Sequence, residues 1–236
     1  MRKILIVIGC IIAASQSFAQ TIKFDAVAGV NSSVYSEKES AYGKAIGGYT
    51  YSVTDSHITG FHAGALITLS HGNFDLQSGL IYTKKGGDDI AVVSPAPGVV
   101  ERDYGHIALS YINLPLNITY NVKLRGCKIF LGGGPYMETG LAGTYTANYI
   151  GYNQSNVTTG TRRFGVGFGG STTSPSFGIG LLGGVHLNNS FTLSTGYEFG
   201  LTNEAYNPIF IAKNNAFKVS VAYTLFKLKQ HRRKTA

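Results

Sequence analysis

The stretch that decides the fold is Asn73–Thr83, NFDLQSGLIYT, in which apolar and polar residues alternate with a period of two. One phase carries Phe74, Leu76, Leu80 and Tyr82, and the other carries Asp75, Gln77, Gly79 and Thr83. Successive side chains of a β-strand point to opposite faces, so this segment has one apolar and one polar face. Alternation over about ten residues is typical of a strand that crosses a membrane in a β-barrel.

The same alternation recurs along the chain. It is clear in YINLPLNITY at 111–120, FTLSTGYEFGL at 191–201 and FKVSVAYTLF at 217–226. Four further segments fit less cleanly: 22–30, 58–70, 128–145 and 176–187. The sequence therefore predicts eight strands.

The connections between these segments decide how the strands are arranged. They alternate between long and short, at 31–57, 71–72, 84–105, 122–127, 146–175, 188–190 and 203–215. A soluble β-sandwich needs no such asymmetry, whereas outer-membrane barrels have short turns inside and long loops outside. No stretch after residue 19 is long and apolar enough for a transmembrane helix. We therefore expect an all-β protein, an eight-stranded antiparallel up-and-down transmembrane β-barrel with short periplasmic turns and long extracellular loops.

The first residues, MRKILIVIGCIIAASQSFAQ, have the order of a secretory signal peptide. Arg2 and Lys3 are followed by an apolar run from Ile4 to Ala14 and by the small residues Ser17 and Ala19. A spanning helix needs roughly 20 apolar residues, which this run does not reach. The sequence predicts a cleaved signal peptide at 1–19, a barrel domain at 20–226 and a location in the cell outer membrane.

Charge and cysteine content exclude several classes of protein. Without Arg2 and Lys3 the chain has 18 basic and 12 acidic residues, a net charge of +6. Five of the basic residues follow Phe226, namely Lys227, Lys229, Arg232, Arg233 and Lys234. Nucleic-acid-binding domains carry a basic folded face, which this barrel body lacks, so no nucleic-acid partner is expected. After cleavage Cys127 is the single cysteine, which excludes an internal disulfide.

The inward phase of the strands carries glycines and charges. An eight-stranded barrel is narrow enough for side chains to fill its lumen, and buried charges must be paired. The expected lumen charge network consists of Lys23, Asp25, Asp75, Lys128, Glu138, Glu198 and Lys218. Counting back from the last loop places Lys218 opposite residue 199 or close to it, within salt-bridge reach of Glu198. We interpret the network as a salt-bridged plug, and a proton or ion path is the alternative.

Two prolines interrupt the predicted sheet. Pro115 and Pro135 lie almost level on adjacent strands, and neither can donate a hydrogen bond to the ladder. The pairing there should be irregular, and the run Gly132–Gly134 could hold a β-bulge that accommodates the missing hydrogen bonds.

Motifs for catalysis are absent. The GxSxG elbow of hydrolases does not occur, and no histidine lies in a hydrolase motif. Four residues could meet at the outer rim and bind a metal if two strands bring them together: His57, His62, Asp103 and His106. This spacing favours neither an enzyme nor a cofactor, and we expect neither.

Several short segments resemble the PorT-like outer-membrane β-barrel family of Bacteroidota. They are Phe18-Ala19-Gln20, YINLPL at 111–116, LGGGPY at 131–136 and the Tyr-x-Leu-Phe close at 223–226. The resemblance implies an eight-stranded barrel similar to OmpX and to the OmpA membrane domain, and no single activity, since the namesake serves a protein-secretion system. Asn113 departs from the family because an acidic residue is expected there. About ten residues after the usual terminal aromatic are a second departure.

The resemblance also implies a role for the closing strand. Val219, Val221, Tyr223 and Leu225 are expected to be the insertion signal read by the barrel-assembly machinery, with Leu225 in the place of the terminal aromatic and Phe226 one step out of phase. The tail 227–236 is expected to be mobile in the periplasm or to rest against anionic lipid headgroups.

The functional expectation is a non-enzymatic outer-membrane barrel with a side-chain-filled lumen, whose loops serve surface recognition or envelope integrity. Its expected partners are outer-membrane lipid or lipopolysaccharide, the assembly machinery, and a surface or periplasmic protein. A subunit of an envelope assembly or secretion system is the alternative, and an outer-membrane lipid-modifying enzyme is the third candidate.

Overall fold

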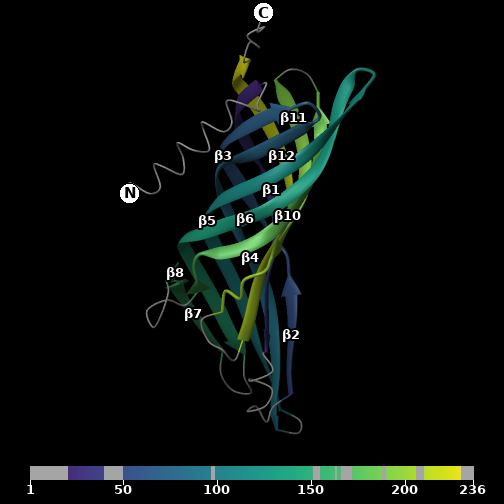
Figure 1. The fold of residues 1–236 in the computed structure, drawn as a ribbon. Helices are drawn as coiled ribbons and strands as arrows, with labels where there is room; N and C mark the ends of the chain where they lie inside the picture. Colours follow the sequence, from purple (N-terminus) through teal and green to yellow (C-terminus); the bar gives the residue numbers. More distant parts are fainter. Residues whose placement is uncertain are drawn as a thin grey trace, which may run out of the picture.

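The computed structural model describes residues 21–39, 50–96, 99–150, 155–162, 164–165, 172–187, 190–205 and 210–229. The predicted signal peptide and residues 230–236 lie outside these ranges. The described chain forms an antiparallel sheet that curls into a barrel (Figure 1). Within it, no helix is long and apolar enough to cross a membrane.

Eight strands form the ring of the barrel. They are β1 (Thr21–Glu39), β3 (Ile58–His71), β4 (Phe74–Ala96), β5 (Val99–Leu124), β6 (Cys127–Ile150), β10 (Ser176–His186), β11 (Phe191–Gly200) and β12 (Phe210–Lys229). Each pairs antiparallel with the next, and β12 pairs with β1 to close the ring. The predicted up-and-down topology of eight strands is confirmed.

Four short strands lie outside the ring. β2 (Thr50–Ser56) pairs with β4, and β7 (Ser155–Arg162) pairs with β6. β8 (Phe164–Gly165) and β9 (Thr172–Thr173) form a small parallel pair. All of them add to one end of the barrel.

The two ends of the barrel differ in their connections. At one end, here called the turn end, β1 begins, β12 ends and the tight turns at 72–73 and 125–126 lie. Gly72 and Gly126 have φ values of +59° and +92°, a left-handed conformation that favours glycine. The opposite, loop end carries the long connections and β2 and β7, which lie at the bottom of Figure 1.

The ring strands are longer at the loop end than the sequence predicts. The expected loop 84–105 is instead part of a β4–β5 hairpin, whose pairing continues from Thr83–Tyr111 to Ala96–Val99. Similarly, β1 pairs with β12 as far as Glu39–Phe210. These extensions form strands because each neighbour continues the ladder.

The outer face of the barrel carries an apolar band between two rows of aromatic side chains. The row near the turn end contains Phe74, Tyr120, Phe191 and Tyr223, and the row near the loop end contains Phe61, Tyr82, Phe177, Phe199 and Phe217. Between the rows, six apolar side chains are exposed on the outer face: Leu76, Leu80, Leu114, Leu116, Val219 and Val221. Aromatic girdles flank the apolar band of outer-membrane barrels, so the segments between these rows span the membrane.

The closing strand contains a β-bulge. Asp25 pairs with Thr224 but Phe24 pairs with Phe226, so Leu225 is the extra residue. A bulge reverses the phase beyond it, which returns Phe226 to the outer face, where it stacks on Phe24 at 4.4 Å between ring centroids. The expected terminal position of Leu225 is corrected accordingly, because Phe226 is the last outward aromatic residue of the strand.

The tail also begins later than expected. Lys227, Leu228 and Lys229 pair with Lys23, Ile22 and Thr21, so the strand does not end at Phe226. Hydrogen bonding to β1 holds these three residues in the sheet. The rest of the predicted tail, 230–236, lies outside the described residues.

The two prolines interrupt the ladders as predicted. Pairing between β5 and β6 jumps from Pro115–Tyr136 to Ile118–Gly133, and pairing between β4 and β5 jumps from Ser78–Leu116 to Ile81–Asn113. The predicted bulge in Gly132–Gly134 is wrong, because that run pairs regularly with β10. The register shift of β5 against β6 lies between Ser110 and Tyr111 instead.

The inside of the barrel combines glycines with large side chains. A Cβ atom at Gly178 would lie 2.3 Å from the Tyr136 ring, and one at Gly184 would lie 2.7 Å from the Phe130 ring. Both glycines therefore make room for an aromatic ring from the neighbouring strand β6. Nearer the loop end the lumen is filled by an apolar cluster of Tyr35, Ile107, Leu109, Tyr111 and Ala212.

Candidate functional site

A cluster of opposite charges fills the lumen near the loop-end row of aromatics. The Lys85 ammonium lies 2.5 Å from the Glu138 carboxylate and 2.6 Å from the Glu198 carboxylate. Lys218 forms the predicted ion pair with Glu198. Two cations and two carboxylates balance, so the central cluster of Lys85, Glu138, Glu198 and Lys218 is neutral.

Asn113 completes the central cluster. Its side-chain amide donates to Glu138 at 2.7 Å and to Glu198 at 3.2 Å, and the residue is fully buried. An acidic residue at this position would add a third carboxylate to two cations and would remove both of these hydrogen bonds. Asn113, where the PorT-like resemblance implies an acidic residue, thus has a structural reason in this chain.

The seven charges expected in one network lie at two levels. Glu138, Glu198 and Lys218 belong to the central cluster. Lys23, Asp25, Asp75 and Lys128 line a cavity at the turn end. The ion pair of Lys218 is diagonal, since Lys218 lies opposite Gly196 rather than residue 199.

Sequence reasoning missed Lys85, the cation that neutralises the cluster. It falls in the stretch expected to be a loop, although the alternation of 74–83 continues through it. Thr83 and Lys85 are fully buried, whereas Lys84 is exposed. Extending the strand phase by two residues is the signal that would have found Lys85.

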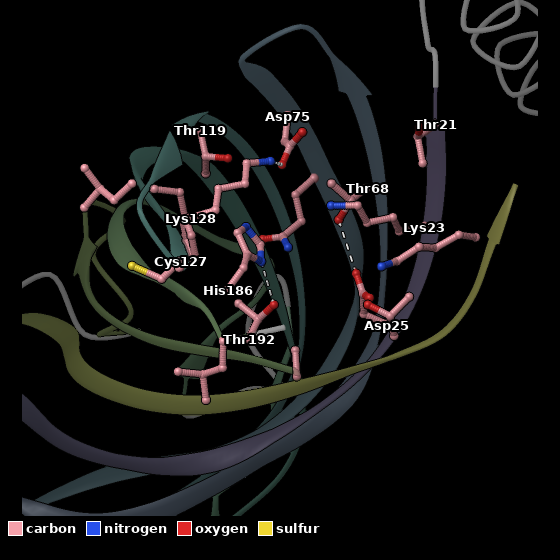
Figure 2. A pocket seen from close by; sticks show the side chains of 18 residues that line it. Thr21, Lys23, Asp25, Thr68, Asp75, Thr119, Cys127, Lys128, His186 and Thr192 are labelled. Atoms are coloured by element: carbon pink, nitrogen blue, oxygen red, sulfur yellow. Dashed lines mark hydrogen bonds and ion pairs between the residues drawn. The ribbon is translucent and has the colours of Figure 1, made fainter. Parts of the chain in front are cut away.

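The turn end of the lumen holds a cavity of about 600 Å³, here called the vestibule (Figure 2). Asp75 lies 4.0 Å from the Lys128 ammonium, and Asp25 accepts a hydrogen bond from the Thr68 hydroxyl at 3.4 Å. His186 is bonded to the Thr192 hydroxyl at 2.8 Å. Lys227 also lines the vestibule, because the bulge at Leu225 turns it inward.

The vestibule corrects the expectation of a lumen filled by side chains throughout. Much of its wall consists of short side chains, which cannot reach the barrel axis: Thr21, Thr68, Thr119, Thr192, Ala222 and Thr224. Farther in, Phe130 and Tyr136 and then the central cluster occupy the axis. The lumen is therefore hollow at the turn end and filled toward the loop end.

A smaller cavity of about 110 Å³ lies between the vestibule and the central cluster, and shares Gln77 and Phe130 with the vestibule. His62 and Ser220 line it, with 2.8 Å between the His62 Nε2 and Ser220 Oγ atoms. A serine nucleophile needs a base that a third group orients. The His62 Nδ1 atom has no such partner among the described residues.

At the loop end, Glu204 belongs to the segment that follows β11, and its side chain is buried. The carboxyl accepts a hydrogen bond from the Tyr111 hydroxyl at 2.8 Å and is buried. Burial raises the pKa of Glu204 to about 7, although the Tyr111 hydrogen bond acts in the opposite direction. Glu204 thus holds this segment against the barrel mouth most firmly when it is protonated.

The structure does not bring together the four residues considered for a metal site. His62 lies in the lumen, and His106 pairs with Asp88 on the outer surface at 2.5 Å. Across the described part of the chain, no group of three or more His, Cys, Asp or Glu side chains is placed to hold a metal ion.

Comparisons with solved structures match outer-membrane proteins at low identity and low TM-score. Neisserial surface protein A matches at 14% identity with a TM-score of 0.38, covering 85% of this chain and 96% of its own. The Ail protein of Yersinia pestis matches at 9% identity with a TM-score of 0.30, covering 87% and 99%. The outer membrane protease OmpT from Escherichia coli matches at 8% identity with a TM-score of 0.36, covering 87% and 97%.

The curated proteins contain no match to this sequence. A family model does match, and it takes in seven of the eight ring strands, all except β12. The eight-stranded ring and the apolar band between aromatic rows agree with that family. Because the model described as outer membrane protein beta-barrel domain matches residues 14–206, the chain belongs to this family and is a protein of the outer membrane.

Proposed function

We propose that the protein is a closed, non-enzymatic outer-membrane barrel that recognises a partner at the cell surface through its loop-end sheet. With the termini and short turns in the periplasm, the loop end is extracellular. The observation that carries the proposal is the continuation of β4, β5 and β6 as a paired sheet far beyond the aromatic row at Tyr82. A strand extension of this kind is not needed to cross the membrane.

The filled part of the lumen supports a closed barrel. Lys85, Glu138 and Asn113 are fully or almost fully buried at the central cluster, and the apolar cluster around Leu109 lies beyond them. An ion path requires a continuous wet lumen, which these two layers interrupt. The transport of small solutes is therefore not part of the proposal.

The loop-end sheet offers two means of recognition. β7 pairs only with β6 among the described strands, so its other edge presents backbone donors and acceptors that an extended peptide could pair with. Side chains on the same sheet are exposed, including Tyr104, Ile150 and Val157. Exposed apolar groups beside an unpaired edge favour a protein partner.

A trimmed hairpin tests this proposal. Replacing residues 89–105 by an Asn-Gly turn keeps Asp88 opposite His106, and it should leave the membrane-spanning ring intact because its pairing lies on the turn-end side of the cut. Cells displaying either chain would be applied to a panel of immobilised extracellular proteins and glycans. We expect the full chain alone to be retained by a member of the panel. Equal retention of both chains, in a trimmed barrel that still folds, would contradict the proposal.

A periplasmic assembly is the second candidate, as the PorT-like resemblance allows. The observation that favours it is the vestibule, which is hollow and polar at the periplasmic end of the lumen. Co-purification from gently solubilised membranes would identify a stably bound subunit. A complex that survives trimming of residues 89–105 would favour this candidate over surface recognition.

The lipid-modifying enzyme is the third candidate, and the His62–Ser220 pair is the arrangement that would serve it. Its serine lies in a cavity of about 110 Å³ in the middle of the barrel, which is too small for an acyl chain. Lipid hydrolysis by the purified chain, lost in Ser220→Ala, would nevertheless establish this activity and overturn the non-enzymatic proposal.

A further inference from the structure

The vestibule has the size and enclosure of a ligand-binding site. Its volume of about 600 Å³ lies within the range of roughly 300 to 1,000 Å³ that small-molecule sites occupy. Each of the eight ring strands contributes at least one lining residue. A ligand here would be surrounded on all sides and would enter from the periplasm.

The charges around the vestibule favour an anion. Among the described side chains at the turn end, five are basic, namely Lys23, Lys123, Arg125, Lys128 and Lys227, whereas only Asp25 and Asp75 are acidic. Lys23 and Lys227 lie directly opposite each other on β1 and β12, and both line the cavity. An anion bound between them is attracted to both ammonium groups. A concave wall of low dielectric constant also strengthens the field inside it.

The type of basic and hydroxyl group narrows the class of anion. The three lining bases are lysines, which bind phosphate groups as point charges. Threonine hydroxyls alternate with the lysines on the same two strands, with Thr21 beside Lys23 and Thr224 before Lys227. Donors that approach from several strands suit a multivalent tetrahedral anion.

We propose that the vestibule binds a phosphate group, carried either by a small periplasmic molecule or by a phospholipid headgroup of the inner leaflet. Lys23 and Lys227 bind the phosphate oxygens from opposite sides, and Thr21 and Thr224 donate hydrogen bonds to them. Asp75 keeps Lys128 directed across the cavity through their contact at 4.0 Å. This site is separate from the extracellular sheet and does not depend on its function.

The test uses the mature chain folded in maltoside micelles, which contain no phosphate. Inorganic phosphate and glycerol 3-phosphate are titrated by calorimetry to probe a soluble source. For a lipid source, the micelles are doped with phosphatidic acid or, as the control, with diacylglycerol of the same chains. The variants are K23Q/K227Q, the charge-conserving K23R/K227R, and K123Q, which removes a charge at the same end without lining the vestibule.

We expect one phosphate probe to bind at one site per chain, and K23Q/K227Q to weaken it by about tenfold or more, as loss of charge-assisted hydrogen bonds implies. K23R/K227R and K123Q should bind within about twofold of the parent chain. Binding of the soluble probes assigns a periplasmic phosphate compound, and binding of phosphatidic acid alone assigns a headgroup. Absence of binding by every probe overturns the proposal. An equal loss of affinity in K123Q and K23Q/K227Q also overturns it. The loss would then reflect the overall positive potential of the turn end and not a specific site in the vestibule. Gel mobility before boiling verifies that each variant is folded.

Discussion

At the scale of single residues, two adjacent lysines have opposite environments. Lys85 is fully buried against Glu138 and Glu198, whereas Lys84 faces outward. Removing one partner of a buried ion pair leaves a charge without compensation, which costs about 3 to 5 kcal/mol. We therefore expect Lys85→Met to lower the free energy of unfolding by this amount in urea titrations monitored by circular dichroism.

Lys84→Met is the matched control, and its effect should stay within about 0.5 kcal/mol, as is usual at exposed positions. The double variant Lys85→Met/Glu138→Gln should recover part of the loss, since it removes one carboxylate together with the cation. If both single variants unfold at the same urea concentration, the central cluster does not stabilise the barrel.

Glu204 predicts a dependence of stability on pH. Its pKa is about 7 in the folded chain against an ordinary value of 4.5, so the folded state binds the proton more tightly. The stabilisation is complete below pH 4.5 and is lost as the pH rises through 7, with a maximum on the order of 3 kcal/mol.

Urea unfolding midpoints between pH 5 and pH 8 measure this effect. They should fall with rising pH in the parent chain and change much less in Glu204→Gln, which keeps a neutral side chain. The same slope in both chains would show that another group is responsible.

At the scale of strands, depth in the membrane should set the cost of a charge on the outer face. Leu116 and Val122 are both exposed on β5, at 48% and 41%, but Leu116 lies between the aromatic rows and Val122 on the turn-end side of Tyr120. Arginine costs about 2 to 4 kcal/mol at mid-bilayer and about 0 to 1 kcal/mol near the interface. We expect Leu116→Arg and Val122→Arg to differ accordingly when the barrel unfolds from lipid vesicles. Equal costs would mean that the band between the rows does not face lipid.

The bulge in β12 makes a second prediction at this scale. Deleting Leu225 should preserve insertion, because Thr224 and Phe226 keep the inward and outward positions that they already have. Deleting Val221 from the regular part of the strand should abolish it, since a shift of one residue exchanges the two faces. The measurement is the amount of heat-modifiable barrel in outer-membrane fractions. The bulge assignment is wrong if the two deletions behave alike.

Much of each strand's membrane part could be predicted from the sequence, and its extension could not. Between the aromatic rows, lipid on one side and the lumen on the other impose alternation, as in Asn73–Thr83. Beyond Tyr82 both faces of a strand tolerate polar residues, so the pattern that separates strand from loop disappears. For this reason the sequence does not place Lys85 in the lumen, and it identifies its partner Glu138 only as an inward-facing charge. Phe226 looked out of phase because a bulge is a property of the pair β1–β12 and not of one strand.

At the scale of the whole molecule, the filled layers of the lumen predict that the barrel does not conduct. The central cluster and the apolar cluster around Leu109 close the axis between the vestibule and the loop end. Purified chain in planar lipid bilayers should produce no conductance steps, although its migration before boiling shows that it is folded. Regular steps at a constant amplitude would show that the two layers open.

The central cluster has a consequence for the route by which the barrel is made. Its five members come from β4, β5, β6, β11 and β12, which are separated by more than a hundred residues of chain from first to last. While the sheet is still open, Glu198 and Lys218 can meet on their hairpin, but Lys85 and Glu138 remain on the far part of the same sheet. Only when β12 meets β1 does the curvature bring both parts to the axis, so we expect the ion pair between Lys85 and Glu198 to form last. In a half-closed barrel these charges stay hydrated and unpaired across the lumen. In the closed barrel they pair, so the central cluster stabilises ring closure from inside.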